Sequence, residues 1–247
     1  MKTASTDGSG LAPTTDRAAD PLEGAPPVTA PEADAPPARP LLRGWSHAVA
    51  LVAILVAGPL LVLRAPTTAS TLALSVYVLS LVGLFGVSAS FHRIRWSGAA
   101  RRRMRRADHS TIFLAIAGSY TAVAVLALRG WAQILVLCLV WVGGALGVTV
   151  RQVWMDVPKW AVALPYVVVG WCALAVIPQL VRGLGGAGFA LIVVGGACYT
   201  IGALCYALRR PDPVPEVFGY HEVFHAFTVA GAVVHFVAIA AFALPRA

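Results

Sequence analysis

Two histidines, His221 and His225, stand four residues apart at the start of the last apolar segment of the chain. On an α-helix this spacing places both imidazoles on one face, about one turn apart. A third histidine, His92, closes an earlier apolar segment, four residues after Ser88. Three imidazole nitrogens from two helices suit Zn²⁺ and leave the fourth tetrahedral position for a water. The pattern therefore predicts a zinc site made of His92, His221 and His225.

A lone acidic residue, Asp108, begins the apolar segment that follows His92. A carboxylate beside a zinc-bound water can orient or deprotonate that water. We therefore take Asp108 and Ser88 as the candidate catalytic residues, with Asp108 as the general base and Ser88 as a hydrogen-bond partner rather than a nucleophile. The alternative for each of the three histidines is an ordinary interfacial or hydrogen-bonded role, which is the commoner role of a single histidine at a helix end.

The other histidines and the acid of the last segment fit this site less well. Glu222 is turned by ~100° from His221 on a helix, so we expect it to favour the positive N-terminal end of that helix. His235 lies about 21 Å farther along the same helix and is expected to line the core. His47 opens the first apolar segment and is expected to be interfacial. A ligand role for His109 stays open.

These residues belong to a chain that is too apolar for a soluble fold. Hydrophobic residues make up 58% of its 247 residues and charged residues 12%, against about 25% charged residues in soluble domains. With a mean hydropathy of +0.76, the composition predicts a polytopic membrane protein. We assign the formal net charge of +8 to contacts with anionic lipid headgroups and not with nucleic acid. The four cysteines form no CxxC pair, which argues against disulfides or a thiolate zinc site.

Apolar runs follow one another from residue 41 onward. Each has about 20 residues, enough for a helix to cross ~30 Å of hydrocarbon. We therefore expect an all-α domain over residues 41–247, a bundle of seven transmembrane helices. The third and fourth runs touch, so a six-helix count is the alternative. The runs are 45–63, 70–92, 108–128, 131–150, 159–178, 187–207 and 221–244.

Residues 1–40 have a different composition. They hold eight of the 17 prolines and six of the 11 acids. Such a segment cannot bury enough apolar surface to order itself, so we expect a disordered tail. It lacks a basic start followed by an apolar run, so we do not interpret it as a signal peptide.

The basic residues predict how the helices are oriented. If there are seven helices, lysines and arginines divide fifteen to four between the two faces. The richer face is expected to be cytoplasmic, which places the N-terminus inside and the C-terminus outside. Seven of these arginines lie in the loop Arg93–Arg106, which we interpret as an anchor for anionic headgroups. His92, Asp108 and His221 then share one depth near the cytoplasmic face. The Ala-, Arg-, Gly- and Val-rich composition favours a bacterial source, and thus the plasma (inner) membrane.

Three motifs in this order resemble the hemolysin III family, which belongs with the progestin and adipoQ receptors and the alkaline ceramidases. The resemblance covers about residues 41–245. The motifs are Ser88-x-x-x-His92, Asp108 with Ser110 and the Ala117-Gly-Ser-Tyr-Thr121 stretch, and Gly219-Tyr-His-Glu-x-Phe-His225.

The resemblance implies a seven-helix bundle with an intracellular N-terminus and a zinc ion near the cytoplasmic side. It implies that the zinc ligands are His92, His221 and His225. It also implies that Asp108 contacts the zinc-bound water and that Ser88 lies near the site. The chain departs from the family pattern at His109, where Tyr is common, and at Ala122, where Pro is frequent, which leaves the shape of the substrate open.

The first functional hypothesis is a zinc-dependent membrane hydrolase that acts on a lipid amide or ester. Zinc lowers the pKa of a bound water to about 7, and Asp108 would take a proton and pass it to the leaving amine or alcohol. The second hypothesis is a membrane-homeostasis or signalling protein with a structural zinc and no turnover. A cytolysin ranks low, because a secreted pore-former must first be soluble. An ion carrier is disfavoured by the scarcity of intramembrane acids.

Overall fold

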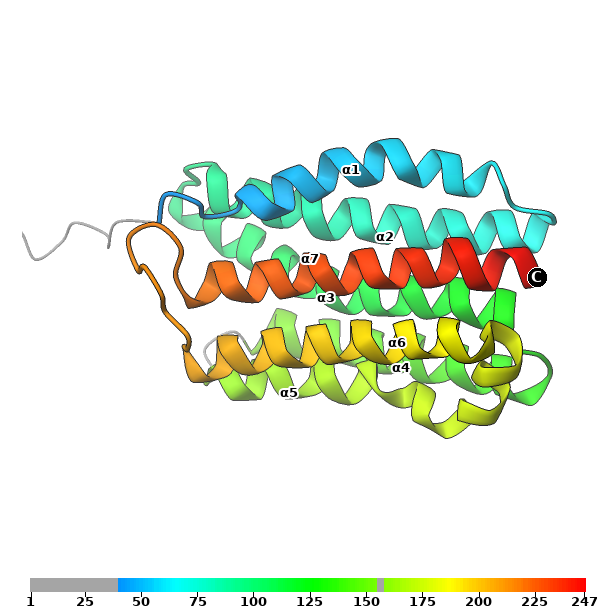
Figure 1. Ribbon diagram of the computed structural model, residues 1–247. Helices are drawn as coiled ribbons and strands as arrows, with labels where there is room; N and C mark the ends of the chain where they lie inside the picture. Colours follow the sequence, from blue (N-terminus) through cyan, green and yellow to red (C-terminus); the bar gives the residue numbers. More distant parts are fainter. Residues whose placement is uncertain (1–39, 155–157) are drawn as a thin grey trace, which may run out of the picture. The chain divides into compact units, whose positions relative to one another are not determined.

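The computed structural model describes residues 40–154 and 158–247, and within these ranges every extended regular element is a helix. The tail expected over residues 1–40 lies outside the described residues, except for Pro40. A short 3₁₀ helix, Cys172–Val176, precedes α6, and a π-helix, Ile239–Ala243, and a 3₁₀ helix, Leu244–Arg246, follow α7. The α-helices are α1 (Trp45–Val62), α2 (Thr68–Arg93), α3 (Gly98–Ala127), α4 (Trp131–Val153), α5 (Lys159–Gly170), α6 (Ile177–Leu208) and α7 (Tyr220–Ala238), all drawn in Figure 1.

Six segments of the described residues are long and apolar enough to cross a membrane. Five contain α1, α2, α3, α4 and α7, and the sixth is the 50-residue stretch Lys159–Leu208, which holds α5 and α6. The predicted all-α membrane class is thereby confirmed, while the number of crossings stays a prediction. The runs predicted at 159–178 and 187–207 both lie within the sixth segment, where Gly185 breaks the helical geometry of α6 with φ 72° and ψ 168°.

The arginine block lies largely on a helix, and the predicted loop is wrong at this point. α3 begins at Gly98, ten residues before the expected start, and so includes Arg101–Arg106. The chain here is Gly-Ala-Ala-Arg-Arg-Arg-Met-Arg-Arg-Ala, and Ala, Arg and Met are among the best helix formers. A hydropathy pattern detects the apolar part of such a helix and misses its charged extension.

Glycines set the close packing between the helices that carry the candidate site. A Cβ added at Gly118 of α3 would lie 2.2 Å from Ser80 Oγ of α2, and one at Gly195 of α6 would lie 2.1 Å from the His235 ring of α7. Small residues let helix backbones approach within membranes. The glycines therefore bring α3 against α2 and α6 against α7.

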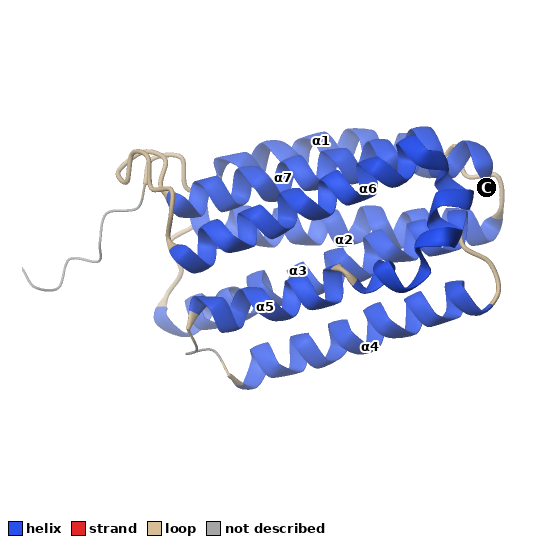
Figure 2. Ribbon diagram, turned by 60° about the horizontal axis from the view of Figure 1, so that its bottom comes forward, coloured by secondary structure: helices blue, strands red, loops and turns tan. Residues whose placement is uncertain are grey.

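The ends of α2, α3 and α7 that carry the candidate site lie at the same end of the bundle. Figure 1 shows the end of α2 and the starts of α1 and α7 at the left, and Figure 2 shows the same bundle with α4 along its lower edge and α5 above α4. Apolar side chains such as Val52, Leu79 and Ile134 are exposed on the outer faces. A surface of this kind fits contact with lipid, and the chain is a multi-pass integral membrane protein.

Candidate metal centre

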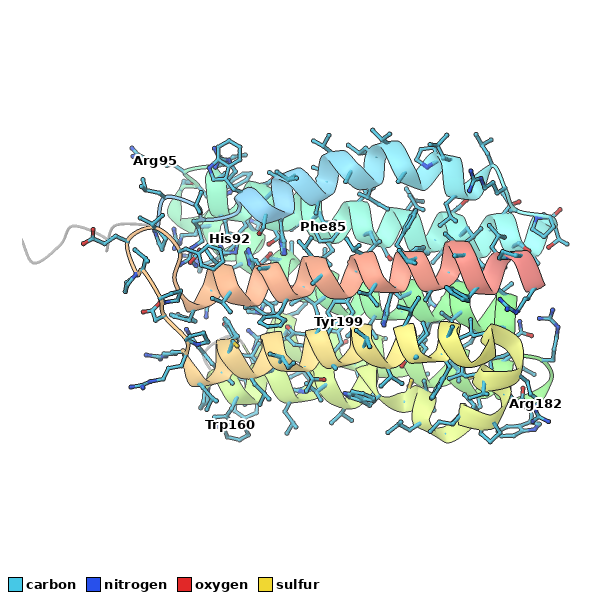
Figure 3. All side chains as sticks on the ribbon, in the orientation of Figure 1. Phe85, His92, Arg95, Trp160, Arg182 and Tyr199 are labelled. Atoms are coloured by element: carbon cyan, nitrogen blue, oxygen red, sulfur yellow. The ribbon has the colours of Figure 1, made fainter. Side chains whose placement is uncertain are left out.

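Three histidines from two helices meet at this end of the bundle. His92 lies in the last turn of α2, and His221 and His225 lie in the first two turns of α7. One ring nitrogen of each lies within 4.8 Å of the others, and the Nε2 atoms of His92 and His221 are 3.3 Å apart. Figure 3 labels His92 at this end of the bundle. The structure thus brings together the three histidines that the sequence singled out.

The histidine cluster fits a metal ion by its donor chemistry. Imidazole nitrogens are favoured ligands of Zn²⁺ and of several other transition metals. His225 is 2% exposed, and its Nδ1 has no hydrogen-bond partner among the described residues. A buried polar atom without a partner costs about 1–3 kcal/mol. A metal ion bound to this nitrogen would offset that cost, so the cluster could hold one.

Asp108 and Ser88 lie beside the same cluster. Asp108 Oδ2 is 3.8 Å from His92 Nε2, and the Asp108 side chain is 14% exposed. Ser88 is buried one turn before His92 on α2 and makes a side-chain hydrogen bond with Asp108. The two candidate catalytic residues therefore contact each other at the edge of the cluster, on the side formed by α2 and α3.

A fourth histidine, His47 of α1, is part of this environment, although the sequence predicted only an interfacial role for it. His47 is 2% exposed rather than interfacial. Its ring stacks on that of His225 with centroids 4.0 Å apart and planes 11° apart, and its edge meets Phe85. Neither of its nitrogens has a hydrogen-bond partner among the described residues. The sequence shows His47 as a polar residue at the start of an apolar run. That pattern does not indicate which helix the His47 side chain contacts.

The start of α7 is held by a buried carboxylate. Glu222 is 2% exposed. Its Oε2 accepts a hydrogen bond from the Gly219 backbone N–H at 2.9 Å, and its Oε1 lies 2.6 Å from Arg43 Nε. As the sequence predicted, Glu222 serves the N-terminal end of the helix instead of joining the histidines. Because it caps α7, it also sets the position of His221 and His225.

The segment before α1 packs against the same site. The backbone N–H groups of Leu41 and Leu42 donate to the carbonyls of Glu216 and Val217 at 2.9 and 3.1 Å. Gly44 follows with φ 78°, and a Cβ added there would lie 2.9 Å from His92 Cβ. A side chain at position 44 would therefore require both an unfavourable backbone and a shift of the cluster.

The two remaining histidines lie outside the cluster. The Tyr166 hydroxyl donates to the backbone carbonyl of His109 at 3.2 Å, which places this part of α3 against α5. His235 Nε2 donates to the Ile192 carbonyl at 3.0 Å, and its ring packs edge-on against Tyr199. His235 therefore links α7 to α6 in the core, which matches its expected role.

Residues 37–236 match the family described as Haemolysin-III related. The chain belongs to this family. Hemolysin-3 of Bacillus cereus is 28% identical over 181 residues, which cover 73% of this chain and 80% of the relative. The Hemolysin-3 homolog of Bacillus subtilis (strain 168) is 31% identical over 131 residues, or 52% of this chain and 58% of the relative. The resemblance inferred from the three motifs is thereby confirmed.

This haemolysin-III related protein has an apolar cavity of about 100 Å³ between α3, α5, α6 and α7, and none of the three clustered histidines lines it. Phe224, whose ring meets that of His221 edge-on at 5.9 Å, forms part of its wall. On α7 the lining continues through Thr228 to His235, a helical distance of about 16 Å. The cavity thus extends along α7 in the apolar interior, and Phe224 lies between it and His221.

Proposed function

We propose that this member of the haemolysin-III related family is a zinc-dependent hydrolase of a lipid amide or ester in the bacterial plasma membrane. The observation that carries the proposal is the convergence of His92, His221 and His225 within 4.8 Å, with the Asp108 carboxylate 3.8 Å from His92. A zinc ion bound there would act as a Lewis acid and make a water reactive at neutral pH.

Asp108 would move the proton in this reaction. Its carboxylate is largely buried beside the cluster and accepts a proton from water, then passes it to the leaving amine or alcohol. Ser88, through its hydrogen bond with Asp108, fixes the direction in which the carboxylate points. Ser88 is therefore a positioning residue, and Asp108 is the group that meets the reacting atoms.

The apolar cavity supports a lipid substrate. Its wall is formed mainly by apolar side chains, and Phe224 joins it to the histidine cluster. An acyl chain in the cavity could reach the cluster with its carbonyl group at the Phe224 end of the cavity. The exposed arginines of the α3 extension, at the same end, would contact anionic headgroups.

We also propose that the chain crosses the membrane seven times, with a cytoplasmic N-terminus. A continuous helix of the 50 residues Lys159–Leu208 would be about 75 Å long, more than twice the ~30 Å of hydrocarbon. α5 and α6 instead lie side by side, as Figure 1 shows. If this segment crosses the membrane twice, the chain has seven crossings, and its lysines and arginines divide fifteen to four between the two faces.

A second candidate function is a membrane-homeostasis or signalling protein with a structural metal. It is favoured by the tight packing of three helices at the cluster, where His47 of α1 stacks on His225 of α7 and His92 belongs to α2. A metal at this junction would hold the three helices together without any turnover. The cytolysin hypothesis keeps its low rank.

The decisive experiment compares metal content, turnover and stability in the same purified samples. If the protein is a hydrolase, the parent should cleave at least one compound in a panel of lipid amides and esters. Asp108→Asn should not cleave that compound, although this variant keeps the zinc content of the parent. The structural alternative expects no turnover in any sample and a large loss of thermal stability in His225→Ala. Hydrolysis that is equal in the parent and in Asp108→Asn would overturn the proposed mechanism.

A further inference from the structure

Three arginines line one open pocket of about 790 Å³ at the opposite end of the bundle. Arg129 lies in the turn after α3, Arg182 in the first part of α6, and Arg246 in the final 3₁₀ helix. Figure 3 labels Arg182 and His92 at opposite ends of the molecule. The pocket is thus separate from the histidine cluster and from the apolar cavity.

Glycines shape this pocket. The Gly183 backbone approaches the end of α3 so closely that an added Cβ would lie 2.1 Å from the Ala127 carbonyl oxygen. Gly185 breaks α6 with φ 72°, and a Cβ there would lie 3.4 Å from Arg246 Nη2. Gly130 makes the turn after α3 with φ 59°. The close approach and the two positive φ angles bring three distant parts of the chain around the same space.

Backbone carbonyls hold each guanidinium in place. A guanidinium has five N–H donors, so each arginine keeps several donors for a further partner. Arg129 Nη1 donates to the carbonyls of Val125 (3.1 Å) and Leu128 (3.0 Å), Arg182 Nε to that of Pro178 (3.1 Å), and Arg246 Nη1 to that of Phe242 (2.9 Å).

The charge around the pocket is unbalanced. None of the three arginines forms an ion pair with another described residue. The acidic residues within residues 40–154 and 158–247 are Asp108, Asp212, Glu216 and Glu222, and these lie at the histidine end. Three like charges around one pocket repel one another, and an anion between them would remove that repulsion. Phosphate suits the planar guanidinium, which binds two of its oxygens at once.

We propose that Arg129, Arg182 and Arg246 form a phosphate-binding site at the end of the bundle opposite the histidines. The site takes either the headgroup of an anionic phospholipid or a free phosphate ion, since both offer the same oxygens. It is independent of the hydrolase proposal, because it requires neither a metal ion nor turnover.

The test uses the full chain purified in a neutral detergent, with binding followed by the rise in thermal stability during titration. The two arms are phosphatidylglycerol and inorganic phosphate, and phosphatidylcholine serves as the zwitterionic lipid control. Arg182→Gln is the main variant, because the Arg182 side chain donates to one carbonyl of its own helix, that of Pro178. Arg64→Gln is the matched control: this arginine is exposed after α1, at the same end of the bundle but outside the pocket.

We expect the parent to respond to one of the two arms, which identifies the source of the phosphate. Arg182→Gln should weaken this binding roughly tenfold or more, as expected for the loss of hydrogen bonds to a charged group. Arg182→Lys keeps the positive charge and should lose less affinity than Arg182→Gln. Arg64→Gln should bind with the affinity of the parent. If neither arm stabilises the parent, or if Arg64→Gln loses as much affinity as Arg182→Gln, the proposal is wrong.

Discussion

Replacing Arg43 by alanine removes the ion-pair partner of the buried Glu222 carboxylate. The Glu222 side chain is 3% exposed, and its Oε1 lies 2.6 Å from Arg43 Nε. Removing one partner of a buried ion pair costs about 3–5 kcal/mol, because the other charge is left uncompensated. The Arg43 side chain is 21% exposed, so water partly screens the pair. We therefore expect Arg43→Ala to lower the free energy of unfolding by about 3 kcal/mol.

The Glu222→Gln background separates this electrostatic effect from lost packing. A glutamine oxygen can still accept the Gly219 N–H, so the cap on α7 is retained, but no charge is left unpaired when Arg43 is removed. We expect Arg43→Ala to cost less than about 1 kcal/mol in that background, the usual range for an ordinary surface change. Reversible unfolding in mixed detergent micelles, followed by circular dichroism, measures all four proteins of this double-mutant cycle.

An equal loss of stability in the two backgrounds would refute this reasoning. It would show that Arg43 stabilises the protein through contacts other than its ion pair with Glu222. The position of α7 would then depend on the backbone pairing of Leu41 and Leu42 with the loop before α7.

Two further substitutions test the packing of the site and of the bundle. His47→Ala removes the ring stacked on His225 and should weaken metal binding roughly tenfold, a loss typical for residues that support a metal ligand. A competition titration with a chromogenic chelator measures the metal affinity. An unchanged affinity would show that the stacked ring does not position His225. Gly183→Ala forces a Cβ against the Ala127 carbonyl and should lower the free energy of thermal unfolding by about 1–3 kcal/mol. Gly186→Ala, with open space around its Cβ, should leave that free energy nearly unchanged. Equal effects of the two substitutions would contradict the close approach of Gly183 to α3.

The histidine cluster was predictable because local periodicity and membrane topology act together. The four-residue spacing of His221 and His225 defines one helical face. The alternating direction of successive spans then brings the end of one helix and the start of another to the same depth. No long-range packing had to be known for His92 and Asp108 to be placed beside them, and the structure brings all four together.

The contacts from α1 could not be predicted in the same way. The stacking of His47 on His225 and the pairing of Arg43 with Glu222 depend on how α1 packs against α7. Periodicity within one helix carries no information about the rotation of another helix. The position of Gly44 against His92 is likewise a tertiary contact.

The boundaries of the helices show a different limit. Hydropathy marks where a helix is apolar, so it missed the charged first turns of α3, where Arg101 begins a run of arginines. The run predicted at 187–207 begins just after Gly185, where the helical geometry of α6 is interrupted, although α6 itself begins at Ile177. At the start of α3, helix propensity and hydropathy therefore give different boundaries.

The zinc content of each purified protomer is the sharpest test of the metal centre. With purification free of chelators, we expect about one zinc ion per parent protomer, as in other three-histidine sites, and a loss of most of it in His92→Ala, His221→Ala and His225→Ala. The matched control is His235→Ala, which removes a buried histidine outside the cluster and should keep the full zinc content. A parent without zinc, or equal zinc in the parent and all four variants, would contradict the assignment of a metal centre to these histidines.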